Sequence, residues 1–172
     1  MLVRTLERSD VRVGFSCGEP SLDVFLERYA WQNQTRHNLG VTYAAIDDWT
    51  RRVVGYFTIA AASIASDSAD APLAPGGYSE IPVVRIARLA VDTRVQGIGL
   101  GSELLHAALR IALEESTRIG CAGVVIDARP EATGFYERFG FRPLGILVGG
   151  GATRPRPVPM WLVIGSVRKA LG

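Results

Sequence analysis

Apolar and polar positions along the chain follow two periods, one typical of strands and one typical of helices. Short apolar runs and two-residue alternation predict strands at residues 2–6, 41–46, 53–64, 86–91, 123–128, 141–148 and 160–164. Apolar residues that return every three or four positions predict helices at about residues 20–38, 100–119 and 132–139. We expect a mobile loop at residues 67–78 and a basic tail with Arg168 and Lys169. The order of elements predicts a mixed α/β sheet with one central ligand cleft.

Composition limits the class of protein more than it identifies it. The 172 residues, 48% of them apolar, fit one globular domain. No apolar run is long enough for a membrane span, and the charged N-terminus does not resemble a signal peptide. Cys17 and Cys121 lack metal-ligand spacing and the chain has two histidines, so no metal site is expected. We therefore expect a cytoplasmic protein with two reduced thiols.

The charge of the chain permits a nucleic-acid partner without requiring one. The formal net charge is +2, and all but one of the 19 basic residues are arginine, the exception being Lys169. Arginine is the better bidentate ligand of phosphate. A GC-rich coding genome explains the same bias equally well.

A glycine-rich turn joins the strand at residues 86–91 to the helix that begins near Leu100. In Gln96-Gly97-Ile98-Gly99-Leu100-Gly101 the glycines let the backbone turn sharply and bring N–H groups close to a ligand. The helix start adds unpaired N–H groups and a positive dipole end, so the turn is expected to bind phosphate. Ser102 replaces the third glycine of a Rossmann fingerprint, and no Walker A Gly-Lys-Ser/Thr is present. The alternative is a purely structural turn.

The spacing Gln96-x-x-Gly99-x-Gly101 resembles the pyrophosphate loop of the GNAT acetyltransferases, which bind acetyl-CoA. A second stretch, Ala132-Thr133-Gly134-Phe135-Tyr136-Glu137-Arg138-Phe139-Gly140-Phe141, resembles the A-x-x-F-Y-x-x-x-G-F signature of that family. The resemblance implies a single GNAT domain over residues 1–172, with a mixed, mostly antiparallel sheet splayed at its central strand and flanked by helices. It also implies acetyl-CoA as co-substrate, bound by Leu89, Ala90, Val91, Gln96, Gly97, Gly99, Leu100, Gly101 and Ser102.

Acetyl transfer to an amine needs a route for the ammonium proton, donors for the developing oxyanion and an acid for the leaving thiolate. Tyr136 occupies the family's position for that acid, and a tyrosine with an ordinary pKa near ~10 is protonated at neutral pH. Its alternative role is aromatic packing beside Phe135 and Phe139. No Glu stands on the strand at residues 86–91, where many relatives place a base, and Glu80 is a weak candidate. The general base is therefore not identified.

The N-terminal half resembles the acetyltransferase toxins of type II toxin–antitoxin modules (the TacT and AtaT type). The matching stretches are Cys17-Gly18-x-x-x-Leu22-Asp23-x-Phe25-Leu26, Ala30-x-Gln32, Val54-Gly55-Tyr56-Phe57-Thr58, Pro82-Val83-Val84 and Arg88-Leu89-Ala90-Val91-Asp92. The resemblance implies acetylation of the α-amine of aminoacyl-tRNA, which blocks translation. It also implies a homodimer, a ribbon-helix-helix antitoxin, and binding to operator DNA only through that antitoxin.

Arginines are the residues through which such an enzyme would bind tRNA. Under this resemblance the candidates are Arg36, Arg85, Arg88, Arg138 and Arg142, with Arg154 and Arg156 in a later loop. Arg85 and Arg88 are three positions apart on one strand, so alternation predicts that only one points into the cleft. For each of these arginines the alternative is ordinary surface charge.

Two other functions remain open. The first is a GNAT enzyme that acetylates a small amine or a protein N-terminus. Its activity would be insensitive to salt, whereas tRNA binding weakens steeply as salt rises. The second is a CoA-binding protein whose main role is corepression with an antitoxin on DNA.

Overall fold

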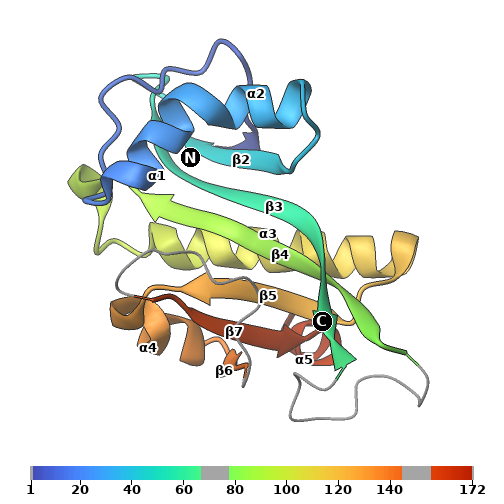
Figure 1. Ribbon diagram of the computed structural model, residues 1–172. Helices are drawn as coiled ribbons and strands as arrows, with labels where there is room; N and C mark the ends of the chain where they lie inside the picture. Colours follow the sequence, from blue (N-terminus) through green and yellow to red (C-terminus); the bar gives the residue numbers. More distant parts are fainter. Residues whose placement is uncertain (1, 67–77, 145–155, 172) are drawn as a thin grey trace. The chain divides into compact units, whose positions relative to one another are not determined.

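The computed structural model describes residues 2–66, 78–144 and 156–171 (Figure 1). The first elements are β1 (Leu2–Thr5), α1 (Pro20–Val24), η1 (Phe25–Tyr29), α2 (Ala30–Thr35), β2 (Val41–Ile46) and β3 (Val53–Ala65). The middle of the chain forms β4 (Glu80–Val91), η3 (Thr93–Val95), α3 (Leu100–Glu115) and η4 (Ser116–Gly120). The last elements are β5 (Gly123–Ala128), η5 (Pro130–Ala132), α4 (Thr133–Glu137), β6 (Arg142–Pro143), β7 (Val158–Val163) and α5 (Ile164–Leu171).

The strands form one mixed sheet of seven strands in the order β1-β2-β3-β4-β5-β7-β6. The pairs β1–β2, β2–β3, β5–β7 and β6–β7 are antiparallel, and β4–β5 is parallel. The parallel register joins Val84–Ile86 to Val124–Ile126, whereas β4 continues to Val91. The ladder therefore covers the early part of β4, as a sheet that splays at its central strand requires. The predicted α/β class, with a mostly antiparallel sheet, is confirmed.

The chain forms two compact units, and β3 and β4 each contribute residues to both. The first unit comprises residues 1–60 and 87–108, and the second comprises residues 61–86 and 109–172. The apolar cluster of the first unit consists of Leu6, Phe15, Phe25, Leu26, Ala30, Ala44, Ile46, Val53, Tyr56 and Ala90. The cluster of the second unit consists of Ile64, Ile81, Val83, Val125, Leu144 and Trp161. Burial of these side chains is the main stabilising contribution within each unit.

The helical segment of the first unit begins where the sequence predicts. The side chain of Glu19 accepts hydrogen bonds from the backbone N–H and the hydroxyl of Ser21, and Pro20 occupies the first turn, where its missing N–H costs no helical bond. Phe25 and Leu26 are buried, so the apolar face of the segment packs into the first cluster. The predicted helix over residues 20–38 is correct in place, but its centre is a π-helical turn, η1.

The C-terminal residues differ from the expected basic tail. Ile164–Leu171 forms α5, whose Val167 is buried and whose last turn contains Arg168 and Lys169. Cations are favourable there because the C-terminal end of a helix dipole is negative. The expectation of a tail was wrong because an eight-residue helix gives too few turns for a clear apolar period.

The bounds of β1, β3 and β7 differ from the predicted ones by one or two residues, and those of β4 and β6 differ by more. β4 begins at Glu80 rather than at residue 86, although Pro82 disfavours a strand because it lacks an N–H group. The side chain of Pro82 is exposed and its carbonyl accepts a hydrogen bond of 2.9 Å from the N–H of Ala122, so the residue still contributes an acceptor to the pairing. β6 covers Arg142–Pro143 alone, because Phe141 and Leu144 on either side of it are not in a strand. Residues 145–148 of the expected strand and 67–77 of the expected loop lie outside the described residues. In the described part of the chain, each helix is too short or too polar to cross a membrane.

Candidate active site

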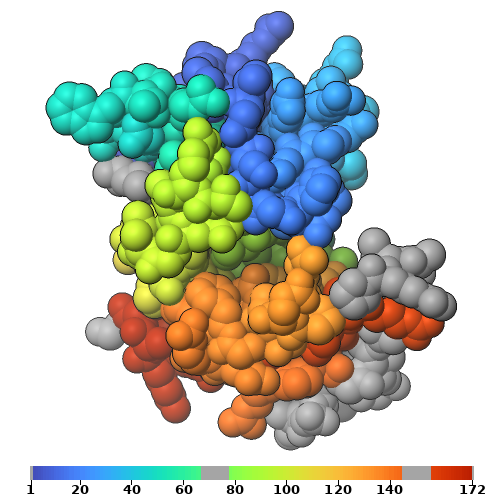
Figure 2. Space-filling model, turned by 90° about the vertical axis from the view of Figure 1, so that its left-hand side faces the viewer, coloured from blue at the N-terminus to red at the C-terminus, as the bar shows by residue number. Residues whose placement is uncertain are grey.

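The turn that follows β4 is held by the side chain of Gln96. Its Nε2 donates hydrogen bonds to the carbonyl of Val91 at 2.9 Å and to the carbonyl of Cys17 at 3.1 Å. Figure 2 shows this segment (yellow-green) packed beside the N-terminal segment (blue) of the same unit. Gln96 therefore fixes the loop through its carboxamide donors, and these donors are not available to a ligand.

An ion pair between the buried carboxylate of Asp92 and the exposed side chain of Arg94 fixes the beginning of the same turn. The carboxylate of Asp92, 1% exposed, accepts hydrogen bonds from Arg94 Nε at 2.8 Å and from the terminal nitrogen of Arg94 at 2.6 Å. It also accepts from the backbone N–H groups of Arg94 and Ser16. The hydrogen bonds from Arg94 lower the pKa of Asp92 to about 2. Asp92 is thus a structural anion, and neither the spacing nor the apolar pattern of the sequence identified it.

The glycines of the turn have the conformation that a phosphate-binding loop needs. Gly97 and Gly99 have φ values of 81° and 96°, and a Cβ added at either position would meet no atom within 4 Å. The carbonyl of Gly99 accepts from the N–H groups of Ser102 and Glu103, which starts α3. Within this turn, the backbone N–H groups of Gly97, Ile98, Gly99, Leu100 and Gly101 have no acceptor among the described residues. This arrangement fits a pyrophosphate, with the side chain rather than the N–H of Ser102 left for contact.

The central strand lies directly before this turn. Ala90 is buried in the first cluster, while Leu89 and Val91 are partly exposed. The N–H of Asp92 donates to the carbonyl of Val54 at 2.9 Å, which fixes the end of the strand. The binding of a pantetheine arm by Leu89, Ala90 and Val91 stays a prediction.

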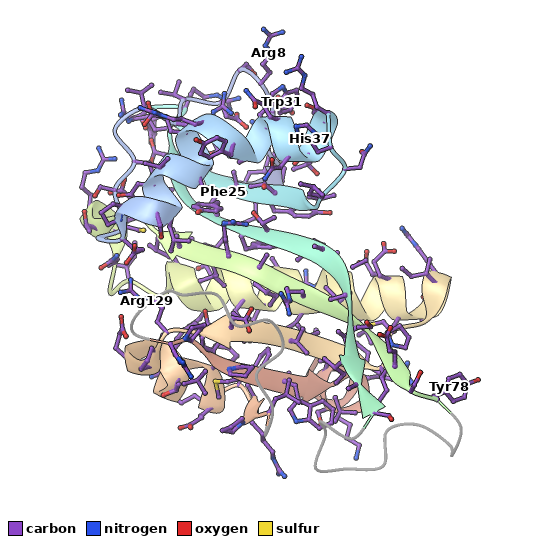
Figure 3. All side chains as sticks on the ribbon, viewed as in Figure 1. Arg8, Phe25, Trp31, His37, Tyr78 and Arg129 are labelled. Atoms are coloured by element: carbon purple, nitrogen blue, oxygen red, sulfur yellow. The ribbon has the colours of Figure 1, made fainter. Side chains whose placement is uncertain are left out.

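Arg88 lies over an aromatic ring in the first unit. Its guanidinium carbon is 3.7 Å from the centre of the Phe25 ring, which points from η1 toward the strands (Figure 3). The Phe25 ring stacks in turn on Tyr56, whose hydroxyl donates to the carbonyl of Leu22 at 2.9 Å. Desolvation lowers the pKa of Arg88, yet guanidinium groups stay charged in proteins. Arg88 has no hydrogen bond or ion pair with any described residue, so its N–H donors are available to an anion.

Tyr136 is positioned by α4 in the second unit. Its side chain is 6% exposed and its ring meets the rings of Phe135 and Phe141 edge-on, at 5.0 and 5.8 Å between centres. Burial raises the pKa of Tyr136 to about 12. The phenol is therefore protonated at neutral pH, and it forms no hydrogen bond within the described ranges. The ring packs as the alternative role required, and the role of the hydroxyl as general acid stays a prediction.

The remaining arginines occupy different surroundings. Arg85 lies beside Asp127, with 3.6 Å between a terminal nitrogen and a carboxylate oxygen. Arg138 is exposed with its guanidinium carbon 5.8 Å from the centre of the Phe135 ring. Exposed positions are also found for Arg36, Arg142 and Arg156, whereas Arg154 lies outside the described residues.

The other candidate groups of the sequence analysis are less suited to chemistry. Glu80 is exposed at the start of β4 and its carboxylate accepts a hydrogen bond of 3.0 Å from the Ser63 hydroxyl. Cys17 and Cys121 are free thiols, and burial raises the pKa of Cys17 to about 11. Over residues 2–66, 78–144 and 156–171, no three His, Cys, Asp or Glu side chains gather as metal ligands would.

Comparisons with known proteins agree with the fold. A model of the acetyltransferase (GNAT) domain matches residues 25–146. The tRNA-acetylating toxin of Mycobacterium tuberculosis (strain ATCC 25618 / H37Rv) is 34% identical over 139 residues, which cover 80% of this chain and 82% of the relative. A solved bacterial toxin is similar with a TM-score of 0.84 and 28% identity, covering 99% of this chain and 95% of that one. AtaTR bound with AcCoA gives a TM-score of 0.78 at 25% identity, with coverage of 99% and 98%.

Proposed function

The chain belongs to the GNAT acetyltransferase family and is an N-acetyltransferase, and we propose that its acceptor is the α-amine of aminoacyl-tRNA. Acetylation of that amine removes the nucleophile of peptide-bond formation, so the enzyme is a toxin that blocks translation. The observation that carries this proposal is the 34% identity to a tRNA-acetylating toxin over 80% of the chain.

The donor in this proposal is acetyl-CoA, which supplies the acetyl thioester. Its pyrophosphate is bound by the N–H groups of the glycine turn, where Gly97 and Gly99 leave space and unpaired donors converge at the start of α3. Leu89, Ala90 and Val91 offer backbone groups to the pantetheine arm. No metal takes part in this scheme.

Tyr136 is the general acid in this proposal. Its phenol has a pKa of about 12, so it carries a proton at neutral pH and can give it to the departing thiolate. The packing of its ring against Phe135 and Phe141 holds the hydroxyl in a defined direction.

Arg88 binds an anionic part of the acceptor in this proposal. A guanidinium group stacked on Phe25 offers its planar edge to a phosphate of the tRNA. Arg36, Arg138 and Arg142 are exposed and extend the contact to more distant phosphates, whereas Arg85 is paired with Asp127. Such contacts make the affinity strongly dependent on salt.

The resemblance of the N-terminal half to type II toxins supports the three partners that such toxins have. We propose a homodimer, neutralisation by a ribbon-helix-helix antitoxin, and binding to operator DNA only through that antitoxin. Co-expression with a small ribbon-helix-helix protein, where one is encoded next to this chain, followed by affinity purification and light scattering, tests the first two. An operator mobility shift with and without the small protein tests the third.

The substrate class is tested by transfer of labelled acetyl groups to charged tRNA, deacylated tRNA and free amino-acid esters at rising salt. We expect transfer to charged tRNA alone at low enzyme concentration, with kcat/KM falling steeply as salt rises from about 50 to about 200 mM. Salt-insensitive transfer to the free esters, with none to charged tRNA, would support the small-amine alternative instead.

A further inference from the structure

One acidic side chain emerges from an otherwise buried strand of the second unit. In β5, which lies between β4 and β7 (Figure 1), Asp127 is exposed whereas its neighbours Ile126 and Ala128 are buried. An ion pair of 3.6 Å joins it to Arg85 of β4. That distance exceeds an ordinary hydrogen bond, and no described residue donates one to Asp127. The carboxylate therefore keeps accepting capacity that the protein does not use.

The arginine beside it is also incompletely paired. Nε of Arg85 is buried, and among the described residues it is the one buried side-chain nitrogen or oxygen without a hydrogen-bond partner. A buried donor without an acceptor is destabilising, so its presence calls for a reason other than stability. Asp127 supplies that reason, because the Arg85 side chain has to stay near the carboxylate to hold it.

Strand alternation brings the pair to one side of the sheet. Arg85 follows Val83 by two positions on β4, and Asp127 follows Val125 by two on β5, and both valines belong to the second cluster. The pair therefore lies at the edge of that apolar cluster. Asp127 is also one residue beyond Ile126, at which the parallel ladder with β4 ends. Opposite Asp127 on β7 is Pro159, so the charged group facing it from the described neighbouring strands is Arg85.

We propose that Asp127, positioned by Arg85, binds the ammonium group of the acceptor and takes its proton. An ammonium group has three N–H donors and no acceptor, which complements a carboxylate that accepts no hydrogen bond from described residues. Arg85 is a positioning residue in this scheme. The inference rests on the proposed acetyl transfer to an α-amine, and it names the proton acceptor that the sequence left unidentified.

The proton balance of the step is complete. The acceptor nitrogen gives one proton to Asp127, which passes it to solvent through its exposed side. The nitrogen then forms a bond to the acetyl carbon, and the carbon–sulfur bond breaks. Tyr136 gives its proton to the thiolate, and the second proton lost by the nitrogen restores the phenol. One proton is released for each acetyl group transferred.

The two other acidic candidates near these strands are less suitable. Glu80 already accepts a hydrogen bond from Ser63, and it stands at the beginning of β4. Asp92 is buried and accepts four hydrogen bonds, from Arg94 and Ser16. Neither carboxylate has the combination of exposure and unused accepting capacity that Asp127 has.

The test is the pH dependence of kcat/KM for Asp127→Asn, Asp127→Glu and the control Glu131→Gln. Glu131 is an exposed acid that pairs with Arg129 at 2.8 Å, so its variant makes the same change of charge outside the proposed site. The acceptors are bulk aminoacyl-tRNA and a mixture of amino-acid esters, measured in short reactions from pH 5.5 to 8. Thermal unfolding and the Kd for acetyl-CoA confirm that each variant is folded and binds its donor.

Wild type and Glu131→Gln bind the ammonium form, so their kcat/KM is nearly flat below the pKa of the amine. For Asp127→Asn we expect a loss of about 100-fold at neutral pH and a rise of about tenfold per pH unit, because only neutral amine then reacts. Asp127→Glu should recover part of the rate. A profile of Asp127→Asn parallel to that of wild type would overturn the proposal. If wild type acetylates the esters but not tRNA, the proposed function fails, while the profiles on esters still decide the role of Asp127.

Discussion

The guanidinium carbon of Arg88 lies 3.7 Å from the centre of the Phe25 ring, and the guanidinium group forms no hydrogen bond with a described residue. The ring fixes the plane of the guanidinium group, so its paired N–H donors keep one direction before a ligand arrives. This preorganisation separates Arg88 from the exposed arginines of the chain.

Replacing either partner is therefore expected to weaken acceptor binding without slowing the chemical step. Arg88→Lys keeps the charge but loses the planar fork, and Phe25→Leu keeps an apolar side chain but loses the ring face. Each should raise KM for aminoacyl-tRNA by about tenfold, which is about 1.4 kcal/mol. Steady-state kinetics provide the measurement, with Arg8→Lys as the control at an exposed site outside the proposed contact. An equal fall in kcat for both variants would argue against a binding role.

Gly99→Ala is expected to raise the Kd for acetyl-CoA, beyond the loss of stability that an alanine causes at any comparable glycine. Gly99 has a φ of 96°, and Gly120, after the long helix, has a φ of 79° with equally open space around its Cβ position. An alanine at either position costs about 1–2 kcal/mol of stability because left-handed backbone is strained for L-residues. Only the Cβ of an alanine at position 99 would lie in the turn whose unpaired backbone N–H groups are proposed to bind the pyrophosphate. Titration calorimetry with acetyl-CoA should show a higher Kd for Gly99→Ala and an unchanged Kd for Gly120→Ala.

The Asp92–Arg94 pair is expected to make stability depend on acid pH. The pKa of Asp92 is about 2 in the folded protein and 3.8 ordinarily, so the ionised form favours folding. The contribution is about 2 kcal/mol above pH 4, and it declines to about half at pH 3 as protons bind the unfolded state first. Urea unfolding of wild type and Asp92→Asn should therefore give free energies that converge as pH falls from 7 to 3. A constant difference over that range would show that Asp92 stabilises the fold by another route.

Most of the fold could be predicted because its elements have strong local patterns. The strands Val41–Ile46 and Gly123–Ala128 have the predicted bounds, since each is a short apolar run between turn residues. α5 was missed because tertiary burial of Val167, rather than a repeated apolar period, holds it in place. Pro82 concealed the early part of β4 for the same kind of reason: its carbonyl pairs with Ala122, which lies far away in the sequence.

The candidate site was predictable from the sequence only where its residues lie close together in one segment. The glycine turn is proposed to bind through its own backbone, so its spacing was enough to make it a candidate. The Arg85–Asp127 and Arg88–Phe25 pairs depend on strand register and helix packing, which bring together residues that are far apart in the chain. One sequence signal pointed to the first pair: Asp127 interrupts the apolar run of Val124, Val125 and Ile126.

The central claim is that Tyr136 supports transfer of an acetyl group from acetyl-CoA to aminoacyl-tRNA. Its most direct test combines radiolabelled acetyl-CoA and bulk charged tRNA with wild type or Tyr136→Phe, followed by ribonuclease digestion and mass analysis of the labelled adenosine. We expect one labelled acetyl group on the α-nitrogen of an aminoacyl-adenosine, lost in Tyr136→Phe although the variant still binds acetyl-CoA. Folded wild type that binds acetyl-CoA and leaves every charged tRNA unlabelled would contradict the claim.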